Sequence, residues 1–224
     1  MRRIGLMSAV LAAVVLLSSP VSAQKQKQPG RGGFGGVSLG QLATNEGVQK
    51  EIKMTEDQIK KVKDVTQEIR TKFRDKFADA GMDREKMQAL FREIQTETDK
   101  AVTAALKPDQ VKRIKQIELQ VIGLRAFGRE EVQKELKFTD KQKEEYTELS
   151  KEVTKDAAAI MEGISFRDRE KFQEAQKKVQ ELNKKALDKF VSKLTADQQK
   201  TYKEMQGEKF DYKPTPPMRP RTDA

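Results

Sequence analysis

The sequence predicts an all-α fold of long antiparallel helical hairpins, with two tandem copies of one helical unit arranged in an elongated molecule. Three observations support this fold class. Apolar residues recur with a 3.6-residue period over long stretches, which is typical of amphipathic helices. A segment of the first half is matched 84 residues later in the second half. Charged residues make up 36% of the chain, as many as the hydrophobic ones, which favours thin helices with large solvated faces.

Residues 1–23 are predicted to be a secretory signal peptide. Arginines at positions 2 and 3 precede an apolar run that ends at Leu17, and the small residues Val21, Ser22 and Ala23 follow as a cleavage site. No later stretch approaches the roughly 20 apolar residues that a transmembrane helix needs, so no membrane span is expected. The chain has no Cys that could carry a lipid anchor. We therefore expect a periplasmic or secreted protein after cleavage near Ala23.

Flexible segments are predicted at both ends of the mature chain. Residues 24–37 are rich in Gly and Gln and are expected to be a linker, because no strand precedes the glycines as a phosphate-binding loop would require. Residues 211–224 contain four prolines and are predicted to be an extended, basic tail.

Three helices are predicted in the first copy. An apolar stripe covers residues 59–77 and ends at Gly81, and a second stripe covers residues 87–102. A third helix begins at Pro108, where the first turn tolerates proline, and it continues to Gly123.

The same pattern recurs in the second half of the chain. Residues 48–55 read Val-Gln-Lys-Glu-Ile-Lys-Met-Thr, and residues 132–139 read Val-Gln-Lys-Glu-Leu-Lys-Phe-Thr. This internal duplication divides the helical region into a first repeat, 38–123, and a second repeat, 124–210. Because each stripe is narrow, we expect the two repeats to pack together through their stripes about an approximate two-fold axis. The expected particle is a monomer with pseudo-two-fold repeats, and the alternative is a homodimer.

Four helix starts share a pattern of an apolar residue, Thr or a substitute, two further residues and Gln. In a capping box, the Thr hydroxyl accepts a hydrogen bond from the third backbone amide of the helix, and the Gln side chain accepts one from the Thr amide. Each motif therefore predicts a stable helix N-terminus. The motif residues are Met54, Thr55 and Gln58; Leu106 and Gln110; Phe138, Thr139 and Gln142; and Leu194, Thr195 and Gln198.

Together the four motifs resemble the Leu-Thr-x-x-Gln signature of the Spy and CpxP family of helical periplasmic chaperones and stress-response proteins. The resemblance implies that each repeat corresponds to one protomer of that family, whose protomers pair into a curved dimer, so that two protomers are fused here in tandem. It covers about residues 48–210. This sequence departs from the signature where Met54 and Phe138 replace Leu and where Lys107 replaces Thr.

The sequence shows no obvious set of catalytic residues. It contains no His and no Cys, which removes Ser-His-Asp and Cys-His catalysis and most zinc, copper and haem ligands. Adjacent carboxylates such as Glu130 with Glu131, or Glu144 with Glu145, point in different directions on a helix and are expected to be solvated. We predict no enzyme, no catalytic or metal site and no cofactor.

The charge of the mature chain indicates which partners it would attract. Without Arg2 and Arg3 it has 43 basic and 35 acidic residues, a net charge of +8. Unfolded or acidic polypeptides are the expected partners, whereas nucleic acid is disfavoured by export and by the lack of an aromatic stacking platform. The predicted function is an ATP-independent chaperone or stress-response protein of the cell envelope. The alternative is a structural or adaptor protein that binds a partner through its helices or its Pro-rich tail. Client-facing residues are not assigned, because the same stripes must form the core.

Overall fold

A computed structural model describes residues 37–81, 83–165 and 167–214. The predicted signal peptide, the linker up to residue 36 and the tail from residue 215 lie outside the described residues. The described elements are α1 (Leu39–Ala43), α2 (Glu46–Glu51), α3 (Glu56–Ala80), α4 (Arg84–Ala105), α5 (Pro108–Ile122), the 3₁₀ helix η1 (Gly123–Gly128), α6 (Glu130–Glu135), α7 (Asp140–Met161), α8 (Arg169–Val191) and α9 (Ala196–Gln206). These described residues include no strand, so the all-α prediction is confirmed. None of the described helices is long and apolar enough to cross a membrane.

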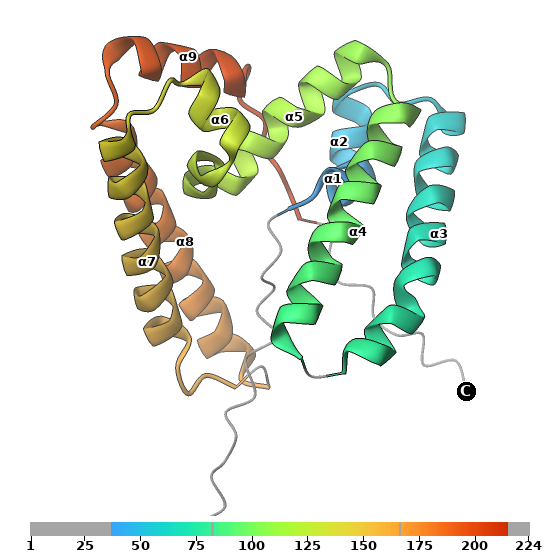
Figure 1. The fold of residues 1–224 in the computed structure, drawn as a ribbon, viewed down its shortest axis with the longest axis horizontal. Helices are drawn as coiled ribbons and strands as arrows, with labels where there is room; N and C mark the ends of the chain where they lie inside the picture. Colours follow the sequence, from blue (N-terminus) through green and yellow to red (C-terminus); the bar gives the residue numbers. More distant parts are fainter. Residues whose placement is uncertain (1–36, 82, 166, 215–224) are drawn as a thin grey trace, which may run out of the picture. The chain divides into compact units, whose positions relative to one another are not determined.

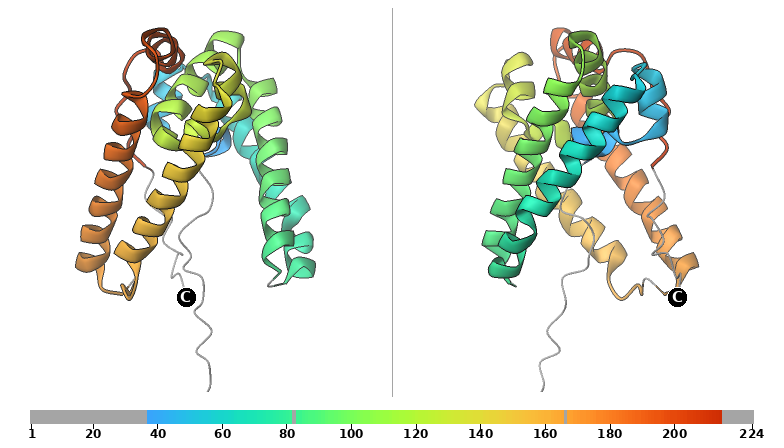
Figure 2. Two further views of the ribbon diagram at one scale, coloured as in Figure 1. Left: turned by 60° about the vertical axis from the view of Figure 1, so that its left-hand side comes forward. Right: turned by 90° about the vertical axis from the view of Figure 1, so that its right-hand side faces the viewer.

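Helices α3 and α4 form the first of two antiparallel hairpins (Figure 1). Helix α3 ends where Gly81 adopts a positive φ of 56°, and α4 begins where the Asp83 carboxylate accepts hydrogen bonds from two backbone amides. Figure 2 shows this pair of helices side by side from two further directions. Two ion pairs, Lys72 with Glu97 and Lys76 with Glu93, link the helices at 2.8 and 3.0 Å. Helices α7 and α8 form the second hairpin, and Asp168 caps α8.

Helix α5 contributes to both hydrophobic cores. Its residues Ile114 and Ile117 belong to a first core built from α1, α2, the start of α3, the end of α4 and α5. Its residues Leu119 and Ile122 belong to a second core that continues through η1, α6, α7, α8 and α9. The apolar stripes of α3 and α4 pack on each other within the first hairpin, and those of α7 and α8 pack within the second. The two repeats are joined through α5, η1 and α9.

Short helices precede each hairpin at matching positions. Helices α2 and α6 begin 84 residues apart, and the lysines that follow them, Lys53 and Lys137, both have positive φ values near 50°. The Gln49 and Gln133 side chains each donate to a backbone carbonyl six residues earlier, at 2.9 and 2.7 Å. These short helices were not predicted, because six residues are too few to show a helical period.

Candidate functional site

The motif glutamines of the first repeat meet in a reciprocal amide pair. The Gln58 amide donates to Gln110 Oε1 at 2.8 Å, and the Gln110 amide donates to Gln58 Oε1 at 3.1 Å. Gln110 is buried and also donates to the carbonyls of Ile52 and Lys53, while its Oε1 accepts from the backbone N–H of Lys107. Two helix starts that lie 52 residues apart in sequence are thus joined at the base of the α3–α4 hairpin.

The second repeat contains the same arrangement. The Gln142 amide donates to Gln198 Oε1 at 2.8 Å, and the Gln198 amide donates to Gln142 Oε1 at 3.1 Å and to the carbonyl of Leu136 at 2.9 Å. Thr139 and Thr195 accept hydrogen bonds from the backbone amides of these glutamines, as Thr55 does from that of Gln58. Lys107 has no such side-chain acceptor.

The apolar motif residues face the two cores. Leu106 is buried in the first core, with Met54 packed against it, and Phe138 and Leu194 are buried in the second core. All motif residues therefore have contacts within the fold that hold the helix starts together.

A buried ion pair lies where the repeats meet. Glu118 on α5 is only 3% exposed, and its two carboxylate oxygens accept hydrogen bonds of 2.6 and 2.8 Å from Arg129. These bonds raise the pKa of Arg129 above its usual value. Asp99 on α4 lies near the pair, and one of its oxygens is buried without a hydrogen-bond partner. Burial, and then the charge of Glu118, raises the pKa of Asp99 to about 6.

This cluster was not predicted from the sequence, although one signal was present. Glu118 follows Ile114 by four residues, so it occupies the buried face of α5 at a position where a hydrophobic residue is normal. By contrast, Glu130 and Glu131 have solvent-exposed side chains, as expected.

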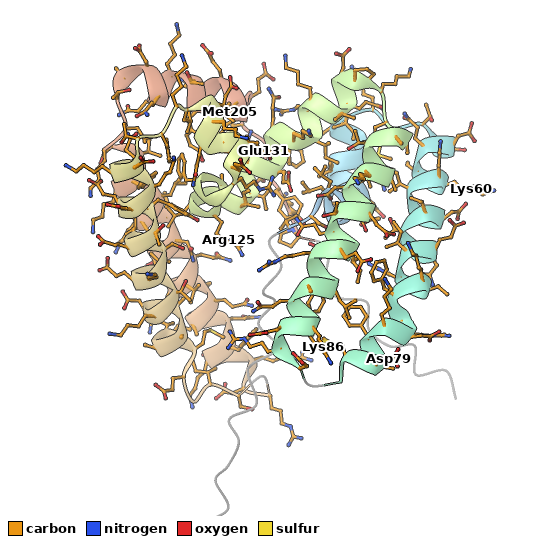
Figure 3. The ribbon with its side chains drawn as sticks, viewed as in Figure 1. Lys60, Asp79, Lys86, Arg125, Glu131 and Met205 are labelled. Carbon is orange, nitrogen blue, oxygen red and sulfur yellow. The ribbon has the colours of Figure 1, made fainter. Side chains whose placement is uncertain are left out.

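An open groove of about 340 Å³ lies next to the ion pair, between α5, α6 and α9. Figure 3 shows Glu131 and Met205 facing this region from α6 and α9. Its lining mixes basic and acidic side chains with apolar ones. In the described ranges, no three acidic side chains come together as a metal site would require.

Apolar side chains also occur near the loop ends of the hairpins, outside both cores. Phe91 is 55% exposed, and its ring contacts Phe77 at a centroid distance of 5.3 Å. We call the half-buried and exposed apolar residues of the first hairpin its distal patch; they are Phe77, Met87, Leu90, Phe91 and Ile94. The second hairpin has half-buried apolar residues in the corresponding region: Ile160, Met161, Ile164, Phe172 and Val179. The stripe pattern predicted the distal-patch residues to be core, but within the described part of the chain they belong to neither hydrophobic core.

Charged side chains surround the distal patch. The ammonium groups of Lys72 and Lys76 lie 5.4 and 4.5 Å from the centre of the Phe73 ring. Asp79 and Lys86 lie near the loop that joins α3 to α4 (Figure 3). Such a surface combines apolar contact area with nearby charges.

Comparison with known proteins identified no relative of this chain. No protein-family model, no curated protein and no solved structure matches the chain.

Proposed function

We propose that this chain is an exported, ATP-independent binding protein that holds unfolded polypeptides in the manner of the Spy and CpxP family. The observation that carries the proposal is the distal patch, where five apolar side chains lie outside both cores at the end of a hairpin. An isolated exposed apolar residue is common, but a patch in which the exposed Phe91 lies against the half-buried Phe77 is a feature of binding surfaces.

The remaining architecture supports this role. The amide pairs join the helix starts at the base of each hairpin, away from the distal patch. The basic mature chain favours rapid encounter with acidic segments, and the apolar patch favours retention after encounter. This division of roles requires neither nucleotide nor metal.

Suppression of client aggregation tests the proposal. The mature chain should slow the aggregation of a chemically unfolded test protein, and Phe91→Asp should weaken this effect strongly. The matched control is Ala89→Asp, which places the same charge at an exposed position two residues away. Phe91 lies outside both cores, so circular dichroism should show unchanged helix content. Equal protection by both variants would reject the distal patch as the client surface.

Ionic strength provides a second arm of the same experiment. Exposed charges are screened over about 10 Å at 0.1 M salt, so protection should develop more slowly in high salt. If the rate of protection is the same at low and high salt, the basic surface has no role in client encounter.

A further inference from the structure

The C-terminal residues 207–214 cross from the second repeat to the first and form what we call the C-terminal strap. Figure 1 shows this segment leaving α9 and running toward α1 and α2. It is not helical, and its aromatic residues Phe210 and Tyr212 pack against the first core. The boundary predicted at residue 211 therefore falls inside a packed segment.

The first repeat holds the strap mainly through the strap's backbone. The Gln120 amide donates to the carbonyls of Gln206 and Glu208 at 2.7 Å each, and Gln120 Oε1 accepts from the Phe210 N–H at 2.9 Å. Arg113 donates to the Glu208 carbonyl, and the Asn45 amide donates to the Lys213 carbonyl, both at 2.9 Å. Hydrogen bonds to backbone atoms recognise a chain whatever its side chains are.

Among the strap side chains, only the two aromatic ones make this binding depend on the sequence of the bound segment. The strap side chains at positions 208, 209, 211 and 213 are exposed, whereas Phe210 and Tyr212 are half-buried. The Tyr212 N–H donates to the Phe210 carbonyl at 3.1 Å, so residues 210–212 form a tight turn, and both rings pack against the first core. The groove formed by α2 and α5 thus accepts an aromatic-x-aromatic segment.

The first core needs these rings because its own helices supply none. Within the described part of the chain, Phe210 and Tyr212 are the only aromatic residues of the first core, whereas the second core contains Phe127, Phe138, Phe190 and Tyr202. The 84-residue offset aligns Phe127 with Ala43 and Glu131 with Gly47. The ring of Phe210 lies 3.8 Å from where a Cβ on Gly47 would stand, so the ring packs directly on α2.

We propose that this groove is a second polypeptide-binding surface, specific for non-helical segments with two aromatic residues one position apart, and that the strap is its internal occupant. An external segment binds by displacing the strap. That the displacing segment is an unfolded client rests on the proposed function, whereas the groove itself does not. The strap limits access because a tethered occupant is present at an effective concentration in the millimolar range.

The test uses the mature chain with Phe210→Ala and Tyr212→Ala, which weakens the strap and leaves every other residue in place. The probe is a fluorescent synthetic peptide of residues 207–214, and the control peptide has both aromatic residues replaced by Ala. Fluorescence anisotropy should show binding of the probe to the variant at least about tenfold tighter than to the wild type, because the wild-type strap competes. The control peptide should not bind.

Three results would overturn the proposal. A variant that keeps its helix content yet binds no probe would make the strap a purely structural segment. Equal affinity for wild type and variant would place the probe elsewhere on the surface. A wild-type chain that forms dimers by exchanging straps would make a second copy the occupant.

Amide hydrogen exchange of the wild type covers the case in which the variant does not fold. Excess probe should speed exchange at the strap amides, including that of Phe210, and the control peptide should leave them unchanged. No change with the probe would reject displacement. If the probe binds but the protein does not suppress aggregation, the groove is a binding surface and the proposed chaperone function is rejected. If the protein suppresses aggregation but does not bind the probe, only the proposal for the groove is rejected.

Discussion

Single side-chain amides have an unusually large structural role in this protein. One Gln side chain, that of Gln110, satisfies two backbone carbonyls, one backbone amide and a partner glutamine. The local half of this arrangement was predicted from the sequence, because a capping box depends on residues three positions apart. The pairing with Gln58 was not predictable, because it depends on how the hairpin closes.

Gln110→Ala should lower the free energy of unfolding by about 1–3 kcal/mol, because the buried carbonyl of Ile52 loses its donor. Urea denaturation followed by circular dichroism measures this change. Gln67→Ala, at an exposed position of α3, is the control and should stay within about 0.5 kcal/mol of the wild type. Similar values for both variants would mean that the amide pair contributes nothing beyond helix propensity.

The raised pKa of Asp99 predicts a pH-dependent stability. A folded-state pKa of about 6, against an ordinary value of 3.8, means that the folded chain keeps a proton that the unfolded chain has lost between these two pH values. The contribution of Asp99 to stability therefore falls as pH rises from about 4 to 6 and is constant above that. The groups that act on it are Glu118 and Glu131, which raise its pKa, and Arg129 and the Leu39 amide, which lower it.

Asp99→Asn should consequently raise the melting temperature at pH 7.5 and raise it much less at pH 4.5, because most of the destabilisation by Asp99 develops between about pH 4 and 6. Asp64→Asn on the exposed face of α3 is the control. Thermal melts of the three proteins at both pH values provide the comparison. A gain for Asp99→Asn that is the same at both pH values would contradict the assignment.

At the scale of the elements, the sequence was most informative where glycine and proline mark helix ends. Gly81 and Gly123 end α3 and α5, and Pro108 begins α5, as the pattern indicated. The strap was missed because prolines after residue 213 favoured a free tail. The packing of Phe210 and Tyr212 could not be predicted from their spacing, because it depends on a first core whose own helices supply no aromatic ring.

Gly207→Ala should disturb the junction between α9 and the strap for two reasons. Gly207 has a φ of 61°, and a Cβ there would lie only 2.4–2.6 Å from the side-chain amide atoms of Gln116. Gly81→Ala is a matched control, because Gly81 has a φ of 56° but open space around its Cβ position. Backbone strain of about 1–3 kcal/mol applies to both variants.

Only Gly207→Ala should add a steric conflict with Gln116. Its loss of stability should exceed that of Gly81→Ala, and hydrogen exchange should show faster opening of the Phe210 amide in the Gly207 variant alone. Identical losses in the two variants would mean that Gln116 moves aside without cost.

At the scale of the whole molecule, the described unit has no natural dividing point between its repeats. Helix α5 places Ile114 in the first core and Leu119 in the second. A boundary at residue 123, as the repeat pattern suggested, would remove Leu119 and Ile122 from the second core. Sequence periodicity reveals repeated units but not which helix their cores share.

Ile114→Ala should therefore destabilise both repeats together. The substitution opens a cavity in the first core and should cost about 2–5 kcal/mol. Hydrogen exchange under native conditions should show reduced protection in α8 as well as in α4, because α5 couples the two cores. Reduced protection confined to the first repeat would show that the cores unfold independently.

The strap also has a consequence in time. A chain that is made or threaded from its N-terminus presents the first repeat long before residues 207–214 emerge, so the first core must wait for its aromatic rings. Contacts that join Asn45 to Lys213 span 168 positions, and such contacts close late in folding. The first repeat therefore cannot complete its packing until the last part of the chain arrives. The polypeptide thus stays incompletely folded while it is being made or threaded.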